Sequence, residues 1–243
     1  MSWAQTCITC CGLFLASVCF AQKADQWGLQ NAMIGPDSPI EIRSGSSYDA
    51  QAMYPVTDGP LFPLRASVQW SISPPVKGIS IDAKSGKIRV DAGVPHGAST
   101  TVHADVAHGR RKLEEKLYVF NAGNNPLIGR WVVGPNIVCG QARETKSPAP
   151  RPRSLLGTLW KFHVDGQFWV GKEMGKAAGT LLSGNYELDL GAAKIKLSAK
   201  VPEGKPESSW SYVLKDSGKT LLLRPLESWD DLEPGCGYIL SLR

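Results

Sequence analysis

Residues 78–90 read Gly-Ile-Ser-Ile-Asp-Ala-Lys-Ser-Gly-Lys-Ile-Arg-Val, and this stretch decides the fold class. Apolar and polar residues alternate on both sides of the central segment from Asp82 to Gly86. A period of two predicts strands with one buried face, and turn-forming residues between two such runs predict a hairpin. The Asp82 carboxylate can accept backbone N–H groups in a tight turn. Gly86 tolerates the left-handed backbone that returns Ile81 and Ile88 to the same core.

The same alternation extends through most of the chain after position 27. Residues 68–72 and 102–106 each place an apolar side chain at every second position. No stretch of a dozen residues in this part carries apolar residues at i, i+3, i+4 and i+7 without an intervening Gly or Pro. We therefore expect an all-β protein built from antiparallel strands.

Turn-forming residues divide the chain into two β domains. Residues 121–126, Asn-Ala-Gly-Asn-Asn-Pro, separate a strand that ends at Phe120 from a new apolar run that begins at Leu127. Each part is long enough to bury its own core. We expect a poorly structured lead-in segment at 22–36, a first domain at 37–121, a linker at 122–126 and a second domain at 127–243.

The first domain is expected to contain short strands at 40–43, 66–72, 78–81, 87–90, 100–107 and 113–120. Short strands at close spacing with turns between them favour a two-sheet sandwich. Residues 78–90, followed by Val94-Pro95 and the strand at 100–107, resemble a stretch that recurs in bacterial immunoglobulin-like and cadherin-like surface domains. The resemblance covers about residues 37–121 and implies an immunoglobulin-like β-sandwich. It implies no particular ligand, since one fold hosts many functions.

The second domain is expected to contain strands at 127–133, 155–164, 167–171, 180–189, 194–200, 209–214, 220–224 and 237–242. Eight consecutive hairpin-linked strands are typical of an up-and-down barrel, which has no free edge. At its start, Gly129-Arg130-Trp131 resembles the Gly-x-Trp of lipocalins and of the shorter bacterial lipocalin-like domains. The resemblance implies an eight-stranded antiparallel lipocalin-like barrel whose closed end is sealed by Trp131.

Cys139 and Cys236 are the two cysteines outside the first 22 residues. In an exported protein such a pair favours a disulfide, which would stabilise the fold by about 4–5 kcal/mol in the chain-entropy model. Two unpaired structural thiols are the alternative.

Those cysteines also predict how the barrel closes. If Cys139 lies opposite Cys236 on the first and last strands, antiparallel counting puts Val132 opposite Arg243. Arg243 then lies beside Trp131, where lipocalin-like barrels pack a late Arg on that Trp by a cation–π contact. Strict alternation would put the two side chains on opposite faces, so the contact requires a bulge or a slip.

Aromatic residues are expected to line the barrel. A two-residue hairpin at Asp165-Gly166 would pair Phe162 with Trp169 and put both on one face with Trp160. With residues from later strands, the ligand-binding candidates are Trp160, Phe162, Trp169, Tyr186, Trp210 and Tyr212. These rings either surround a cavity for an apolar or aromatic ligand or simply fill a small barrel.

The first residues are typical of a targeting segment. Residues 1–22 carry no charged side chain, and residues 7–21 form an apolar run of 15. A bilayer span needs about 20 such residues, so the run indicates the h-region of a secretory signal peptide at 1–21. A lipid anchor on Cys19 is the rival interpretation. We expect a secreted, periplasmic or cell-envelope location, with no membrane span after cleavage.

The charge pattern points to one loop. The net charge of +5 is mild, and no dense stripe of Lys and Arg calls for nucleic acid. Residues 140–154 form a Pro-rich stretch with four basic residues and one acidic residue, and we expect no strand there. This stretch is either a docking site for an acidic or protein partner or a solvated loop.

Motifs of catalysis are missing from the sequence. Gly-x-Ser-x-Gly, Gly-x-x-x-x-Gly-Lys-Ser/Thr and His-Glu-x-x-His do not occur. His96, His103 and His108 have no recognisable further ligands for a metal, so we expect no metal, no cofactor and no enzymatic activity. Two hypotheses follow: an exported protein whose barrel holds a small apolar or aromatic ligand, and a structural or adhesive envelope module that binds protein or glycan partners through its surfaces.

Overall fold

The structure, a computed structural model, describes residues 27–55, 61–139, 143–146, 155, 157–172, 179–199, 207–227, 232 and 235–243. Strands account for 62% of these residues and helix for 4%, so the chain is nearly all β, as the alternation predicts. The expected signal peptide at 1–21 lies outside the described residues, so it stays a prediction. In the described part of the chain, no helix is long and apolar enough to cross a membrane.

The chain forms two compact units. One comprises Met1–Ile40, Gly45–Asp91 and Ser99–Leu117, and the other comprises Glu41–Ser44, Ala92–Ala98 and Tyr118–Arg243. Among the described strands, β1 to β10 pair with one another and β11 to β19 pair with one another. We call the first group the sandwich and the second group the barrel. The change of sheet falls between Phe120 and Gly129.

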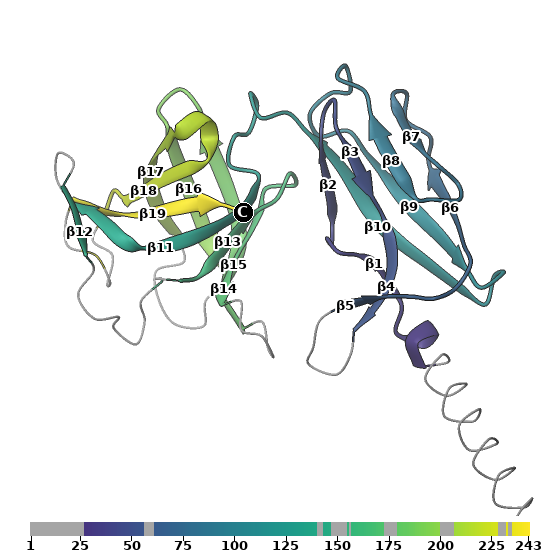
Figure 1. Ribbon diagram of the computed structural model, residues 1–243. Helices are drawn as coiled ribbons and strands as arrows, with labels where there is room; N and C mark the ends of the chain where they lie inside the picture. Colours follow the sequence, from purple (N-terminus) through teal and green to yellow (C-terminus); the bar gives the residue numbers. More distant parts are fainter. Residues whose placement is uncertain are drawn as a thin grey trace, which may run out of the picture. The chain divides into compact units, whose positions relative to one another are not determined.

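Three small sheets make up the sandwich (Figure 1). The largest has the order β2-β10-β9-β6, formed by Ile40–Arg43, Arg111–Phe120, Ser99–Val106 and Val68–Ser73. The second has the order β3-β8-β7, formed by Ser47–Asp49, Lys87–Val90 and Ile79–Ile81. The third has the order β1-β4-β5, formed by Met33–Gly35, Gln51–Pro55 and Leu61–Pro63. Each sheet contributes buried aliphatic side chains: Ile40 and Val102 come from the first sheet, Ile88 from the second and Ile34 from the third.

The hairpin between β7 and β8 has the turn chemistry that the sequence predicts. Asp82 Oδ1 accepts hydrogen bonds from the backbone N–H groups of Ser85 (2.7 Å) and Lys84 (3.0 Å). These bonds lower the pKa of the Asp82 carboxyl below its ordinary value, and the bond from the Ser85 backbone has the largest effect. The predicted role of Asp82 as the acceptor of this turn is confirmed.

Gly86 ends the same turn in a conformation that favours glycine. Its φ is +73°, and a Cβ at this position would lie 2.7 Å from the carbonyl oxygen of Ala50 and 2.8 Å from the Trp70 ring. The turn brings Ile81 directly opposite Ile88 in the antiparallel pair. The left-handed glycine is therefore confirmed, and it also makes room for Trp70 of β6.

The lead-in segment expected at 22–36 is folded where the structure describes it, so that prediction is wrong from residue 27 onward. Residues 27–30 form a helical turn, and β1 pairs antiparallel with β4, with Ile34 opposite Ala52. The sequence analysis did not predict β1, β3, β4 and β5. In β1, β4 and β5 apolar residues are adjacent rather than alternating with polar ones, so these strands show no period of two.

Eight strands close the barrel in the order β11-β13-β14-β15-β16-β17-β18-β19 (Figure 1). Their bounds are Gly129–Cys139, Leu159–Phe162, Gln167–Lys172, Gly179–Asp189, Lys194–Ala199, Glu207–Lys215, Thr220–Pro225 and Cys236–Leu242. The last strand, β19, pairs antiparallel with the first, β11. The predicted eight-stranded antiparallel barrel is confirmed.

The stretch 140–154, expected to contain no strand, includes β12 (Arg143–Lys146), so the prediction is wrong for these residues. β12 pairs antiparallel with the second half of β11, with Ile137 opposite Thr145. On that side of β11, pairing with β13 ends at Val132. The edge of β11 beyond this point is open, and β12 satisfies its backbone groups.

Candidate functional site

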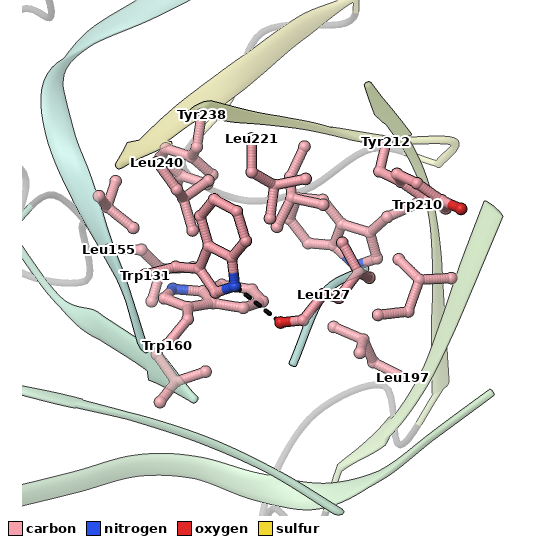
Figure 2. Close-up of a cluster of buried hydrophobic side chains, with 14 of the residues drawn as sticks. Leu127, Trp131, Leu155, Trp160, Leu197, Trp210, Tyr212, Leu221, Tyr238 and Leu240 are labelled. Carbon is pink, nitrogen blue, oxygen red and sulfur yellow. Dashed lines mark hydrogen bonds between the residues drawn. The ribbon is translucent and has the colours of Figure 1, made fainter. Parts of the chain in front are cut away.

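The interior of the barrel is the candidate site, because aromatic side chains from most of the barrel strands converge there (Figure 2). Alternate residues along the barrel strands form one buried cluster with Leu127, Leu155 and Leu232 from the connections. Its aromatic members are Trp131, Trp160, Phe162, Phe168, Tyr186, Trp210, Tyr212 and Tyr238. Of the predicted ligand-binding residues, the structure thus brings together Trp160, Phe162, Tyr186, Trp210 and Tyr212.

These rings pack directly against one another. Trp160 and Trp210 meet edge to face, with ring centroids 6.0 Å apart and planes at 74°. Phe162 and Tyr186 do the same at 5.2 Å and 78°. Trp210 stacks on Tyr238 at 6.4 Å. Each such pair contributes about 0.5–1.5 kcal/mol beyond the burial of its area. Trp160 and Trp210 are at most 1% exposed, so the rings fill the space between the strands.

The polar atoms of the buried indoles are bonded to partners inside the barrel. Trp131 Nε1 donates to Leu127 O at 2.7 Å, Trp160 Nε1 to Thr158 Oγ1 at 3.2 Å, and Trp210 Nε1 to Ser208 Oγ at 2.9 Å. Figure 2 shows the first of these bonds. A ligand pocket needs a few polar groups aimed at its ligand. These three N–H groups instead fix the indoles in place.

Tyr186 anchors a polar network at one end of the barrel. Its hydroxyl donates to His163 O at 2.6 Å and accepts from Asn125 Nδ2 at 2.6 Å. Asn125 Oδ1 in turn accepts from the backbone N–H of Leu127 at 3.1 Å. Burial raises the pKa of the Tyr186 hydroxyl far above its ordinary value. Asn125, expected in the linker, is therefore part of the barrel.

Cys139 and Cys236 form a disulfide, which confirms the predicted pair. The two residues lie directly opposite each other on β11 and β19. The bond therefore joins the two strands whose pairing closes the barrel. It closes a loop across a sequence separation of 97 residues, for which the chain-entropy model gives about 4–5 kcal/mol.

The predicted register of this seam holds at the disulfide and then shifts. Ile137 pairs with Tyr238 as antiparallel counting from the cysteines requires, but Val132 pairs with Ser241 rather than with Arg243. The prediction is wrong because the ladder is irregular between Val133 and Ile137, where the sequence reads Gly-Pro-Asn. A proline in a strand removes a ladder donor and favours such an irregularity.

The shift changes what lies near the predicted closing residues. Trp131, fully buried, pairs with Leu242, and the backbone N–H of Arg243 donates to Arg130 O at 2.9 Å. Gly129 has a φ of +139°, a backbone conformation that L side chains rarely adopt, so this position favours glycine. The cation–π contact between Arg243 and Trp131 stays a prediction.

Trp169 lies on the face of its strand opposite to the one predicted. Phe162 pairs with Phe168, and Trp169 pairs with Lys161. The turn that follows β13 is one residue longer than the assumed two-residue hairpin, and a change of one residue reverses the face of every following side chain. Trp169 is therefore outside the buried cluster, and Phe168 takes its place.

Sequence reasoning also missed Tyr238 as an interior residue. Cys236, Tyr238 and Leu240 alternate on β19 and are all buried in the cluster. The predicted disulfide contained the signal, because a cysteine that bonds across the barrel seam places the residues two and four positions later on the same face.

Two open pockets are lined by described residues of the sandwich. One is lined by Leu29, Gln30, Arg110 and Arg111, and the other by Ser67, Val68, Gln69, Asp105 and His108. In the described part of the chain, no group of three or more His, Cys, Asp or Glu side chains is placed to hold a metal ion. Apart from β12, the docking candidate at 140–154 lies outside the described residues.

Comparisons with known proteins give remote likenesses. A chimeric titin Z1Z2 aligns over 37% of this chain and 95% of its own, at 14% identity and a TM-score of 0.22. Domains 5–6 of the S-layer protein SbsC align over 88% and 86%, at 11% identity and a TM-score of 0.27. The N-terminal four Ig domains of Dscam1 align over 87% and 70%, at 9% identity and a TM-score of 0.28. No family model and no curated protein matches the chain.

Proposed function

We propose that the chain is an exported, non-catalytic module in which the barrel is a solid structural domain and partners bind at outer surfaces. The observation that carries this proposal is the packing of the barrel interior. Trp160 and Trp210 pack against each other and are at most 1% exposed, and their N–H groups are bonded within the barrel. Eight strands enclose a space that side chains alone can fill.

Export is supported by the disulfide and by the apolar run at 7–21. Disulfides persist in oxidising compartments and are rare in the cytosol. The absence of catalytic motifs from the sequence supports the non-catalytic part of the proposal. Mass analysis of the exported protein tests the location: a chain that begins at Gln22 supports it, and an unprocessed cytoplasmic chain contradicts it.

The competing hypothesis is a lipocalin-like barrel that holds an apolar or aromatic ligand. The two are separated by titrating the purified protein with fatty acids, indole and an apolar dye while tryptophan fluorescence is recorded. The proposal predicts no saturable change. Saturable binding of one ligand per chain would overturn it.

A designed cavity provides the positive control. Trp210→Ala removes a fully buried indole, and apolar cavities of this kind bind small aromatic molecules. We expect this variant to bind indole. Trp169→Ala is the matched control, because it removes an indole outside the buried cluster and should bind nothing.

A further inference from the structure

The sandwich carries aromatic side chains on its surface. Trp27 is 41% exposed and Phe62 is 44% exposed, and both rings adjoin Tyr54. The Trp27 and Tyr54 rings meet edge to face at 6.1 Å, and the Tyr54 and Phe62 rings lie 6.3 Å apart. We call Trp27, Tyr54 and Phe62 the aromatic patch. Exposed aromatic groups in contact with one another mark an interaction surface more strongly than scattered apolar residues do.

Local structure holds the patch in place. Tyr54 and Phe62 are directly opposite each other on β4 and β5. Trp27 begins the helical turn at 27–30, and its carbonyl oxygen accepts from both the backbone N–H and the side-chain amide of Asn31. Gly28 of this turn lies against the Tyr54 ring, since a Cβ there would be in ordinary contact with the ring at 3.6 Å. The exposed rings are thus positioned by ordered backbone.

Two guanidinium groups adjoin the same helical turn. Arg110 and Arg111 are exposed, and they line a surface pocket with Leu29 and Gln30 of the segment that begins at Trp27. Trp and Tyr favour the interface between membrane and water, and Arg and Lys favour anionic headgroups. The combination of exposed rings and paired arginines is therefore complementary to an anionic lipid surface.

The position of the patch along the chain would bring it close to a membrane during the proposed export. The apolar run ends at Ala21, and only residues 22–26 separate it from Trp27. An extended chain of this length spans at most about 20 Å. While the run is held in a bilayer, during export or by a lipid on Cys19, Trp27 must lie within that distance of it.

We propose that the aromatic patch, with Arg110 and Arg111, binds the surface of an anionic lipid bilayer. The rings enter the headgroup region, and the guanidinium groups bind lipid phosphates. The inference rests on the export proposed above. The lipid-binding proposal and the export proposal can be refuted separately, because vesicle binding is measured on purified protein and export is measured by the position of the N-terminus.

Co-sedimentation with vesicles tests the proposal, using the exported chain after its N-terminus has been verified by mass. We expect binding to phosphatidylcholine vesicles that contain phosphatidylglycerol and little binding to pure phosphatidylcholine. Reversing Arg110 and Arg111 to Glu should weaken partitioning at least about 25-fold, since each basic residue near the surface contributes a factor of about five. Trp27→Ala with Phe62→Ala should weaken it about tenfold or more.

Matched controls lie on the barrel. Leu181→Ala removes an apolar side chain that is 45% exposed, and Lys172→Glu with Lys215→Glu reverses two exposed charges. Both should leave partitioning unchanged. Absence of binding, equal binding to both vesicle types, or equal loss in the barrel controls would overturn the proposal. Lipid-free self-association that is lost in Phe62→Ala would also overturn it, by assigning the patch to a second copy of this chain.

Brominated lipids give a second readout that does not depend on affinity. Bromine quenches indole fluorescence only at short range, so quenching on vesicles should be largely lost in Trp27→Phe, which keeps an aromatic ring. Quenching that persists in this variant would contradict the proposed orientation, because it would come from an indole outside the patch, such as Trp169, which lies outside the buried cluster of the barrel.

Discussion

The sandwich and the barrel place their aromatic residues in opposite ways. In the barrel, eight aromatic side chains belong to the buried cluster. In the described part of the sandwich, Trp70 is the one aromatic side chain among the buried residues, and Trp27 and Phe62 are exposed. Large rings are costly to expose, so those on the sandwich surface call for a functional explanation, whereas those in the barrel are explained by packing.

The two regions also differ in how they treat strand edges. The barrel pairs β19 with β11, and β12 pairs with the part of β11 that β13 leaves uncovered. The sandwich consists of three sheets, with β6 at one edge of the largest and β7 at one edge of another. A closed barrel favours a rigid structural role. An open sandwich with exposed rings favours contacts with partners.

The largest expected effect is on the barrel seam. Replacing Cys139 and Cys236 with Ser should destabilise the barrel by about 4–5 kcal/mol, because the unfolded chain regains the entropy of a long loop. The sandwich should unfold at an unchanged denaturant concentration. Denaturation followed by tryptophan fluorescence measures the difference, and equal loss in both units would contradict the separate roles.

A smaller change in stability should distinguish the buried indoles from those outside the buried cluster. Trp210→Ala should destabilise the barrel by about 3–5 kcal/mol, the usual cost of removing a buried indole. Trp169→Ala and Trp27→Ala should each cost well below that, since neither ring belongs to the buried cluster of the barrel. Chemical denaturation of the three variants checks the order. A cost for Trp210→Ala no larger than that for Trp169→Ala would show that the interior is not packed.

Features that depend on local sequence were predicted correctly, and features that depend on pairing between strands were not. Period-two patterns located the longer strands, and the local chemistry of Asp82 and Gly86 fixed the hairpin at residues 78–90. Counting across turns failed, because one extra residue before Gln167 reversed the face of Trp169. The predicted pairing of β11 with β19 was wrong for a similar reason, because the irregularity at residues 134–136 shifts the partner of Val132.

The sequence therefore predicted most of the residues of the candidate site but not how their side chains pack. Five of the six proposed ring residues do converge, since alternation along each strand determines which side chains face inward. Whether rings enclose a cavity depends on how side chains from different strands interlock, and no single strand encodes that. The aromatic patch was missed because apolar residues in β4 and β5 are adjacent rather than alternating with polar ones, so neither strand was predicted.

A further substitution tests the polar network at the barrel end. Tyr186→Phe keeps the ring but removes the hydroxyl that bridges Asn125 and His163. Leaving these buried groups without a partner should cost about 1–3 kcal/mol. Urea denaturation measures it. An unchanged midpoint would mean that the network does not stabilise the barrel.

The smallest effect concerns pH and belongs to the sandwich. The pKa of Asp82 is lowered from its ordinary value of 3.8 by hydrogen bonds in the turn, so its ionised form stabilises the folded state above that value. This stabilisation is lost as the pH falls through the lower folded-state pKa. Asp82→Asn should therefore differ from the native chain at neutral pH and converge with it in acid. Denaturation of the sandwich at several pH values checks this, and a difference that grows in acid would contradict it.

Hydrogen exchange of the indole N–H groups, followed by NMR, tests the contrast between the two units most directly. We predict that the N–H groups of Trp131, Trp160 and Trp210 exchange only when the barrel unfolds, and that apolar ligands do not shift their resonances. The N–H group of Trp27 should exchange at once. Rapid exchange at Trp160 and Trp210, or shifts in their resonances on ligand addition, would show that the barrel holds an accessible cavity and would contradict the account.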